Sequence, residues 1–246
     1  MKKILIICVT YHSDKELQAF MESVHRAAER VEGKMEVNLQ VADNGKENLG
    51  YLGGALPIYN KYAKEYDYVS ISNVDLELAP DFFEQLLRVD TKGLGWIAPD
   101  IYTTKIDRHE NPYMLYRPSK RNFLIWNIIY SSIWIYKLYH KLYVIKSHKK
   151  KTLFQTCDIY AGHGSFMLFT KAFVLNYPEL HCPTFMYGEE IYMAELIKKS
   201  QLKVRYTPTL HIANTGNIST GLIHQDRKSK WSKESLNTIR KMFFIA

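Results

Sequence analysis

Two features of this sequence combine residue types and spacing that fit catalytic chemistry, and the first is Asp75. It follows an apolar, strand-like run at 68–72, with Asn73 and one valine between them. An aspartate just beyond a buried strand can bind a hard cation such as Mg²⁺ or Mn²⁺ through oxygen, and a diphosphate can complete the octahedron. An aspartate that caps a helix or closes a turn has the same local pattern, so both interpretations stay open.

The second feature is a pair of glutamates, Glu189 and Glu190, which follows Gly188 at the start of an expected helix. Adjacent side chains on a helix point in different directions, so one carboxylate can be structural while the other faces a ligand. A carboxylate held near neutral pH can deprotonate a hydroxyl group. The alternative is the ordinary preference of acidic side chains for the positive end of a helix.

Apolar runs that alternate with amphipathic segments position these residues. We expect strands at 3–10, 35–42, 68–72 and 96–98, with intervening helices at 13–24, 55–64 and 82–88. Ser13 and Glu16 match a capping box at the first helix. Further on, we expect a strand ending near 170, a helix to about 200 and a strand at 204–207. This order predicts an α/β fold with a mostly parallel, doubly wound sheet and helices on both faces.

Ligands of open α/β sheets bind at the carboxyl ends of the parallel strands. Polar residues follow the expected strands at these ends, and we expect them to border one crevice: Thr10, Tyr11, Asp43, Asn44, Asn73, Asp75 and His211. A lone histidine such as His211 is more often a structural side chain than a ligand.

A glycine-rich loop precedes the second expected helix, where residues 48–54 read NLGYLGG. Gly50, Gly53 and Gly54 would let backbone amides approach a pyrophosphate at the helix start. The loop follows the second strand and matches neither G-x-G-x-x-G nor the P-loop pattern, which disfavours a dinucleotide fold and a P-loop. An ordinary turn has the same composition.

Positive charge is concentrated in two segments of the 246-residue chain. Residues 117–151, the basic insert, hold nine Lys or Arg and no Asp or Glu, which exceeds the net charge of +8. Residues 221–246, the C-terminal segment, hold six basic against two acidic residues, so the remainder is net acidic. This asymmetry indicates an anionic partner, either a phosphate-rich ligand, a membrane surface or nucleic acid, unless it only solubilises the surface. The acidic remainder and the lack of a recognised motif argue against nucleic acid.

The centre of the basic insert is apolar: seventeen of the twenty-three residues at 123–145 are large hydrophobics. They fall almost all round a helix, and lysines or arginines flank both ends. This pattern favours an anchor at a membrane interface. A pair of buried helices or a dimer interface are the alternatives, and the oligomeric state stays open.

Three widely spaced cysteines predict neither a disulfide framework nor a zinc site, and the start of the chain does not match a signal peptide. We therefore expect a cytoplasmic protein.

Seven motifs in order resemble the family 2 glycosyltransferases, the inverting GT-A enzymes of bacterial surface polysaccharide synthesis. The likeness is strongest to their rhamnosyl- and galactofuranosyltransferase-like branch. Four strand-end motifs are similar to its VTYNS, VVDNG, ENLGFAGG and LNPDVEL segments: VTYHS (9–13), VADNG (41–45), ENLGYLGG (47–54) and SNVDLEL (72–78). Three later ones are similar to its SGAxML, FxYGED and HxxxxG segments: AGHGSFML (161–168), FMYGEE (185–190) and His211 with Gly216.

The resemblance implies a role for each matching residue. Donor nucleotide and sugar would contact Thr10, Tyr11, Asp43, Asn44, Asn48, Gly50, Gly53, Gly54 and Asn73. Asp75 and His211 would bind the divalent cation, Mg²⁺ or Mn²⁺. Glu190 stands at the position of the general base, and Glu189 at that of the preceding acid.

The implied reaction moves a sugar from a UDP- or dTDP-sugar to a hydroxyl of a glycan or lipid-diphosphate-linked glycan. The implied organisation is one GT-A domain at 1–220, with a nucleotide-binding half at 1–100 and an acceptor half at 101–220, followed by the basic tail at 221–246. The basic segments would hold the enzyme at the cytoplasmic face of the inner membrane. Two departures from the family pattern, Glu190 for Asp and Asn73 for the first acid of D-x-D, leave a catalytically inactive scaffold as the rival. A sugar-nucleotide pyrophosphorylase would need a Gly- and Arg-containing loop after strand one, which 10–14 lacks.

Overall fold

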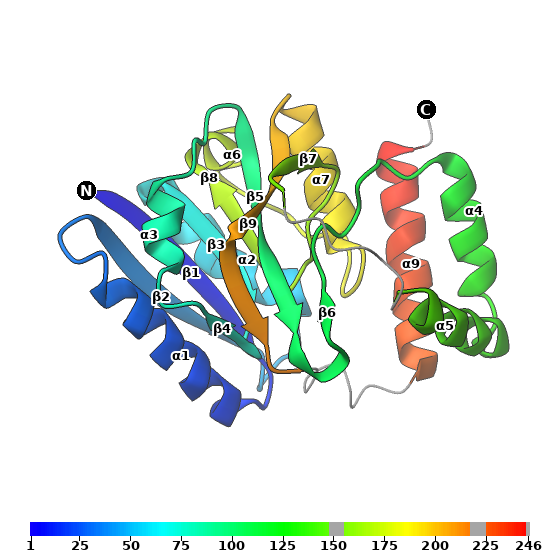
Figure 1. Ribbon diagram of the computed structural model, residues 1–246. Coiled ribbons are helices and arrows are strands. Elements are labelled where there is room, and N and C mark those ends of the chain that lie inside the picture. Colours follow the sequence, from blue (N-terminus) through cyan, green and yellow to red (C-terminus); the bar gives the residue numbers. More distant parts are fainter. Residues whose placement is uncertain (148–154, 217–224, 245–246) are drawn as a thin grey trace.

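The computed structural model describes residues 1–147, 155–216 and 225–244 of the chain. Its strands form one twisted sheet in the order β2-β1-β3-β8-β5-β9-β4, with β6 paired to β5 and β7 to β9 (Figure 1). The strands are β1 (Lys2–Thr10), β2 (Met35–Asp43), β3 (Tyr68–Asn73), β4 (Leu76–Leu78), β5 (Leu94–Thr103), β6 (Arg108–His109), β7 (Cys157–Ile159), β8 (Phe166–Thr170) and β9 (Lys203–Asn214). The pairings make β1, β2, β3, β5 and β9 parallel to one another, whereas β8 runs antiparallel between β3 and β5.

Helices cover both faces of this sheet, as predicted. They are α1 (Asp14–Glu29), α2 (Tyr51–Tyr62), α3 (Phe82–Leu87), α4 (Lys120–Ile129), α5 (Ile133–Ser147), α6 (Lys171–Asn176), α7 (Glu189–Lys199) and α9 (Gln225–Phe243), with short 3-10 turns at Ala63–Glu65 and Thr104–Ile106. Helices α1 and α3 pack on one face and α2, α6 and α7 on the other. Strand β1 supplies Ile4, Ile6 and Cys8 to the first core and Leu5, Ile7 and Val9 to the second. A strand buried on both faces is apolar without alternation, which is why this run marks a central parallel strand.

Three local predictions differ from the structure. Helix α2 begins at Tyr51, so the glycine-rich segment forms its first turn instead of a loop before it. The capping box does not form, because the Ser13 hydroxyl donates to the Tyr11 carbonyl at 3.0 Å. Strand β9 continues to Asn214, which places His211 inside the strand.

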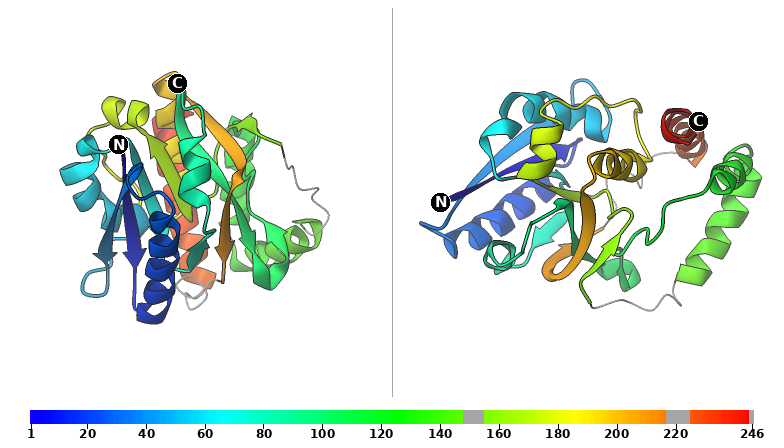
Figure 2. Two further views of the ribbon diagram at one scale, coloured as in Figure 1. Left: turned by 60° about the vertical axis from the view of Figure 1, so that its left-hand side comes forward. Right: turned by 90° about the horizontal axis from the view of Figure 1, so that it is seen from above.

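The basic insert and the C-terminal segment form a separate layer of helices outside α7, seen to the right in Figure 1 and from above in Figure 2. Helix α9 packs against α4, α5 and α7, so most of the expected tail is a docked helix. Residues 148–151, 221–224 and 245–246 of these two segments lie outside the described residues. In the described part of the chain, no helix has the length and apolarity needed to cross a bilayer.

An ion pair between the exposed Arg117 and the buried Glu195 attaches this layer to α7. Arg117 makes a bidentate contact with Glu195, with its Nε 2.7 Å from Oε1 and its Nη2 2.9 Å from Oε2. The same guanidinium donates to the Phe243 carbonyl at 3.0 Å and lies 4.0 Å from the centre of the Phe244 ring. The Tyr160 hydroxyl donates to Glu195 Oε1 at 2.7 Å. The contacts of Arg117 thus join the start of the insert, α7 and the end of α9.

We predict that Arg117→Ala lowers the free energy of unfolding by about 2 kcal/mol, because it leaves the buried Glu195 carboxylate with fewer donors. Urea denaturation measures this change. Arg205→Ala is the matched control, since its partner Asp158 is 41% exposed against 6% for Glu195, and removal of Arg205 should cost less than about 1 kcal/mol. Equal losses in the two variants would contradict the anchoring role of Arg117.

Candidate functional site

The carboxyl ends of three parallel strands meet as the sequence predicts. Thr10, at the end of β1, pairs in register with Asp43 at the end of β2. Val9 of β1 pairs with Asn73 at the end of β3. The register therefore brings Thr10, Asp43 and Asn73 to one edge of the sheet.

Asp43 and Tyr11 are exposed at this edge. The Asp43 Oδ1 accepts a hydrogen bond from the Gly45 amide at 2.7 Å, which closes a turn and fixes the carboxylate. The ring centres of Tyr11 and His12 are 4.4 Å apart. An exposed carboxylate beside an aromatic ring can accept from a nucleobase N–H while the ring stacks on the base.

Asn44 and two of the glycines shape the backbone around the crevice. The Asn44 side-chain amide is buried and donates to the Gly50 carbonyl at 2.8 Å. A Cβ at Gly54 would lie 2.6 Å from Asn44 Oδ1, and one at Gly50, where φ is 78°, would lie 1.9 Å from the Phe185 carbonyl oxygen. Glycine is therefore required at both positions by close packing.

Gly53 and Asn48 have different surroundings from those two glycines. A Cβ at Gly53 would meet nothing nearer than Leu49 Cβ at 3.4 Å. The exposed Asn48 accepts from the Gly50 amide through its Oδ1 at 3.0 Å. Direct contact of these loop residues with a nucleotide stays a prediction.

The structure does not bring His211 next to Asp75. Asp75 is buried, and its backbone carbonyl accepts from the Thr215 amide at 3.1 Å. His211 lies four residues earlier on β9, opposite Ala79, which separates it from Thr215 by about 13 Å at the usual strand rise. This register does not support the predicted pairing of Asp75 and His211 on one cation. Among the described residues, no group of three or more His, Cys, Asp or Glu is arranged to hold a metal ion.

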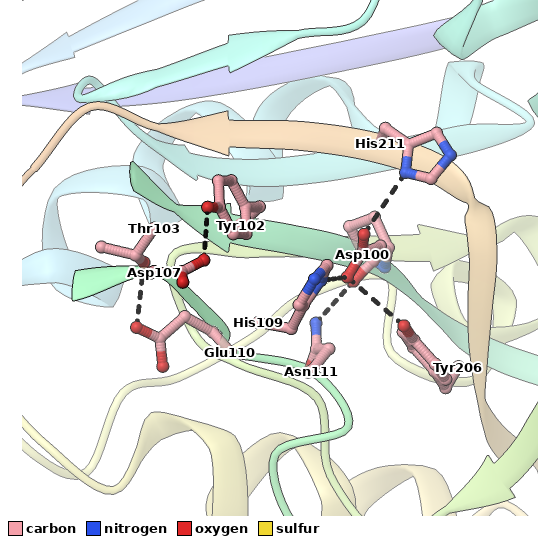
Figure 3. Close-up of polar contacts among 10 residues, drawn as sticks. Asp100, Tyr102, Thr103, Asp107, His109, Glu110, Asn111, Tyr206 and His211 are labelled. Atoms are coloured by element: carbon pink, nitrogen blue, oxygen red, sulfur yellow. Dashed lines mark hydrogen bonds and ion pairs between the residues drawn. The ribbon is translucent and has the colours of Figure 1, made fainter. Parts of the chain in front are cut away.

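His211 instead joins a polar cluster on β5, β6 and β9 (Figure 3). Its Nδ1 is 3.3 Å from Oδ2 of the buried Asp100, and His109 Nδ1 is 2.7 Å from Oδ1 of the same carboxylate. The Tyr206 hydroxyl donates to Asp100 at 3.3 Å. The pairing of β9 with β5 jumps from Thr207 to His211, so three residues bulge out and the histidine is brought opposite Asp100.

The two glutamates at the start of α7 occupy different environments, as the sequence suggests. Glu189 is buried, and its Oε1 accepts from the Tyr187 amide at 2.8 Å. Burial, with a further contribution from the Glu190 charge, raises the pKa of the Glu189 carboxyl well above its usual range. Glu190 is partly exposed, and a Cβ at Gly164 would lie 2.7 Å from its Oε1. The loop before β8 therefore packs directly against the Glu190 carboxylate.

Tyr51 links these glutamates to Asp75, although sequence reasoning did not select it. Its buried hydroxyl donates to the Ile71 carbonyl at 3.0 Å. Burial raises the pKa of Tyr51, and the charges of Glu189, Glu190 and Asp75 add to the effect. The available signal was its position inside the glycine-rich motif.

Comparison by sequence finds no matching family model and no matching curated protein. Comparison of the structure does find matches. The catalytic domain of Drosophila β1,4-galactosyltransferase 7 in complex with xylobiose superposes with a TM-score of 0.55 and 12% identity, over 94% of this chain and 80% of that one. A point mutant of that enzyme in complex with manganese, UDP-Gal and xylobiose gives 0.53 and 13%, over the same shares. A fragment of S. aureus TarS gives 0.52 and 9%, over 98% of this chain and 72% of the fragment.

At such low identity the likeness defines the fold alone. The chain has the α/β architecture of GT-A glycosyltransferases, with a central, mostly parallel sheet flanked by helices, which confirms the predicted fold class.

We predict that Glu189→Gln makes the protein more stable at high pH. A carboxyl whose pKa is raised by folding binds its proton more tightly in the native state, so its contribution to stability falls as pH rises above its unfolded pKa of about 4.3. The glutamine side chain cannot titrate and keeps an oxygen for the Tyr187 amide, so that part of the pH dependence should vanish. Urea unfolding between about pH 5 and pH 8 measures it. Glu65→Gln, at an exposed position, is the control. If the free energy of unfolding varies with pH in the same way in the wild type, Glu189→Gln and Glu65→Gln, the raised pKa of Glu189 would be contradicted.

Proposed function

We propose that this chain is an inverting glycosyltransferase that moves a sugar from a UDP- or dTDP-sugar to a hydroxyl of a glycan or lipid-diphosphate-linked glycan, in bacterial surface polysaccharide synthesis. The observation that carries the proposal is the position of Glu190 within this fold. The partly exposed carboxylate lies against Gly164, and the carbonyl of the next residue, Ser165, accepts from the Asn73 amide at the strand ends at 2.8 Å. Glu190 also lines a pocket beneath the outer helices. A carboxylate in this position can act between a donor and an acceptor.

The donor nucleotide would bind at the ends of β1, β2 and β3. Asp43 and Tyr11 are available to a pyrimidine base, with Thr10 and Asn73 beside them. Asn44, Gly50 and Gly54 would act by fixing the loop that borders the donor, whereas Asn48 and Gly53 have room to approach it. The Drosophila neighbour in complex with manganese and UDP-Gal has the same fold, which supports a nucleotide-sugar donor.

A divalent cation, Mg²⁺ or Mn²⁺, fits the charges at this edge of the sheet. Asp75 offers a hard oxygen ligand, and the charge of Glu190 adds to the negative potential there. Asp75 would hold the cation together with diphosphate oxygens, and His211 is not part of this proposal. When bound, such a cation neutralises the charge that develops on the leaving diphosphate.

Glu190 would act as the general base. It would take the proton from the acceptor hydroxyl as that oxygen attacks the anomeric carbon from the face opposite the diphosphate. The new C–O bond forms as the bond to the diphosphate breaks, so the anomeric configuration is inverted. Glu189, whose raised pKa favours the protonated form, would limit the charge repulsion on Glu190.

We predict that Glu190→Gln lowers the rate of transfer by at least about 100-fold and leaves nucleotide binding intact, because an amide cannot accept the proton. Calorimetric titration of UDP and dTDP, with Mn²⁺ or with EDTA, checks binding, and product analysis checks transfer. The exposed Glu179→Gln on the preceding loop is the matched control. Near-wild-type transfer by Glu190→Gln would contradict its role as base. Absence of nucleotide binding in the wild-type protein would favour the inactive scaffold.

We also propose that the basic insert attaches the enzyme to an anionic membrane surface. The outer faces of α4 and α5 expose the apolar side chains of Leu124, Ile128, Trp134, Leu138 and Leu142. Exposed basic residues stand among them: Lys120, Arg121, Lys137 and Lys141. Apolar side chains can enter the lipid interface while the lysines and arginines meet its phosphates. Helix α9 buries Ile239 but leaves Met242 half-exposed, so the C-terminal segment would add mainly charge.

We predict that the double variant Trp134→Ser/Leu138→Ser binds vesicles containing phosphatidylglycerol at least about tenfold more weakly, because each residue loses its apolar transfer energy. Cosedimentation measures the binding, with neutral vesicles for comparison. Tyr116→Ser is the control, since Tyr116 is highly exposed but lies before the helices. Unchanged binding by the double variant would assign the exposed face to packing between copies of the chain.

A further inference from the structure

A cavity of about 390 Å³ lies between the outer helices and the start of α7. Its walls come from the segment before α4, from α4, α5 and α9, and from residues 187–191, so distant parts of the chain surround it. Such a volume is within the usual range for small-molecule sites. The proposed binding of the donor nucleotide at the strand ends does not use this cavity.

Aromatic side chains dominate the walls of the cavity. They are Tyr113, Trp126, Tyr130, Tyr136, Tyr139 and Tyr187. Tyrosine and tryptophan each combine an apolar ring face with a hydrogen-bonding group at the edge. A pyranose has the complementary design, with apolar C–H faces and a rim of hydroxyls.

The hydroxyls of the cavity are neutral hydrogen-bonding groups. Burial raises the pKa of Tyr130 to about 12 and that of Tyr187 still further, so both phenols keep their protons at neutral pH. The hydroxyl-bearing Ser232 of α9 is among the lining residues. Neutral hydroxyls both donate and accept, which suits the hydroxyl groups of a sugar.

The charge at the cavity is negative, because Glu190 lines it. A carboxylate repels a phosphate or a uronic acid at short range but accepts a hydrogen bond from a neutral hydroxyl. Lys137 of the basic insert is directed elsewhere, with its ammonium 5.6 Å from the centre of the exposed Trp134 ring.

We propose that this cavity is the acceptor subsite and that it binds an uncharged sugar ring, stacked on the aromatic side chains, with one hydroxyl directed at Glu190. This inference rests on the proposed function and narrows its acceptor to glycans that end in a neutral sugar. A quaternary ammonium group is the other ligand that an aromatic cavity with a carboxylate can attract, and it provides the competing outcome of the test.

Saturation-transfer NMR on the full chain tests the proposal with methyl glycosides of glucose, galactose, mannose, rhamnose and N-acetylglucosamine. Glucuronate and choline are the charged comparisons. We expect a signal from at least one neutral glycoside and none from glucuronate. Preference for choline or glucuronate, or no signal from any neutral glycoside, would overturn the proposal.

Three variants of α5 locate the bound sugar. Tyr136→Ala should weaken binding of the glycoside at least tenfold, whereas Trp134→Ala, on the outer face of the same helix, should leave it unchanged. Tyr136→Phe, which keeps the ring and the fold, should bind better than Tyr136→Ala. Equal effects of Tyr136→Ala and Trp134→Ala would overturn the assignment to this cavity.

Titration of UDP with Mn²⁺ into the same samples separates this inference from the proposed function. Nucleotide binding without any response to neutral sugars would overturn the acceptor subsite and leave the donor site standing. If Tyr136→Ala still gives the saturation-transfer signal of the sugar and the protein binds no UDP, both the acceptor subsite and the proposed function would be overturned.

Discussion

The ion pair between Arg117 and Glu195 is the contact on which the outer half of this protein depends. Glu195 is buried in the middle of α7, and the guanidinium that satisfies it also contacts the end of α9 through the Phe243 carbonyl and the Phe244 ring. Without this ion pair, α4 and α9 would lose a charged contact with α7 of the GT-A core. The cavity beside Glu190 has walls from these helices, so its shape depends on a contact made elsewhere on α7.

Environment gives the two adjacent glutamates different properties. Glu189 is buried and hydrogen-bonded to the chain that leads into the helix, whereas Glu190 is partly exposed and lines the cavity. One helix start thereby supplies a carboxyl that favours its neutral form and, beside it, a partly exposed carboxylate. Adjacent side chains on a helix point in different directions. The direction in which the chain enters α7 therefore decides which glutamate is buried, and Gly188, with a φ of 85°, sets that direction.

The sequence predicted the sheet and the convergence of its strand ends because apolar runs such as 3–10 have few alternatives to a central strand. It did not predict the place of His211, because three bulged residues of β9 shift the register and no local pattern marks such a bulge. Helix α9 was missed for a physical reason: Ser229, Ser232 and Ser235 form part of its buried face, so hydrophobic periodicity has little to detect. The apolar residues at 123–145 fall all round a helix because some of them line a cavity while others face outward.

The walls of the cavity contribute no strand to the sheet. Helices α4 and α9 supply Phe123 and Ile239 to the buried core. Substitutions of Tyr136 and Tyr139 in α5 can alter the cavity without disturbing the core that forms the strand ends. Evolution can vary the two regions at different rates, and descendants of this chain can keep one nucleotide-side architecture while the outer helices diversify. In such a lineage, the residues at the strand ends would be the most informative about ancestry. The residues of the outer helices would be the most informative about ligand preference.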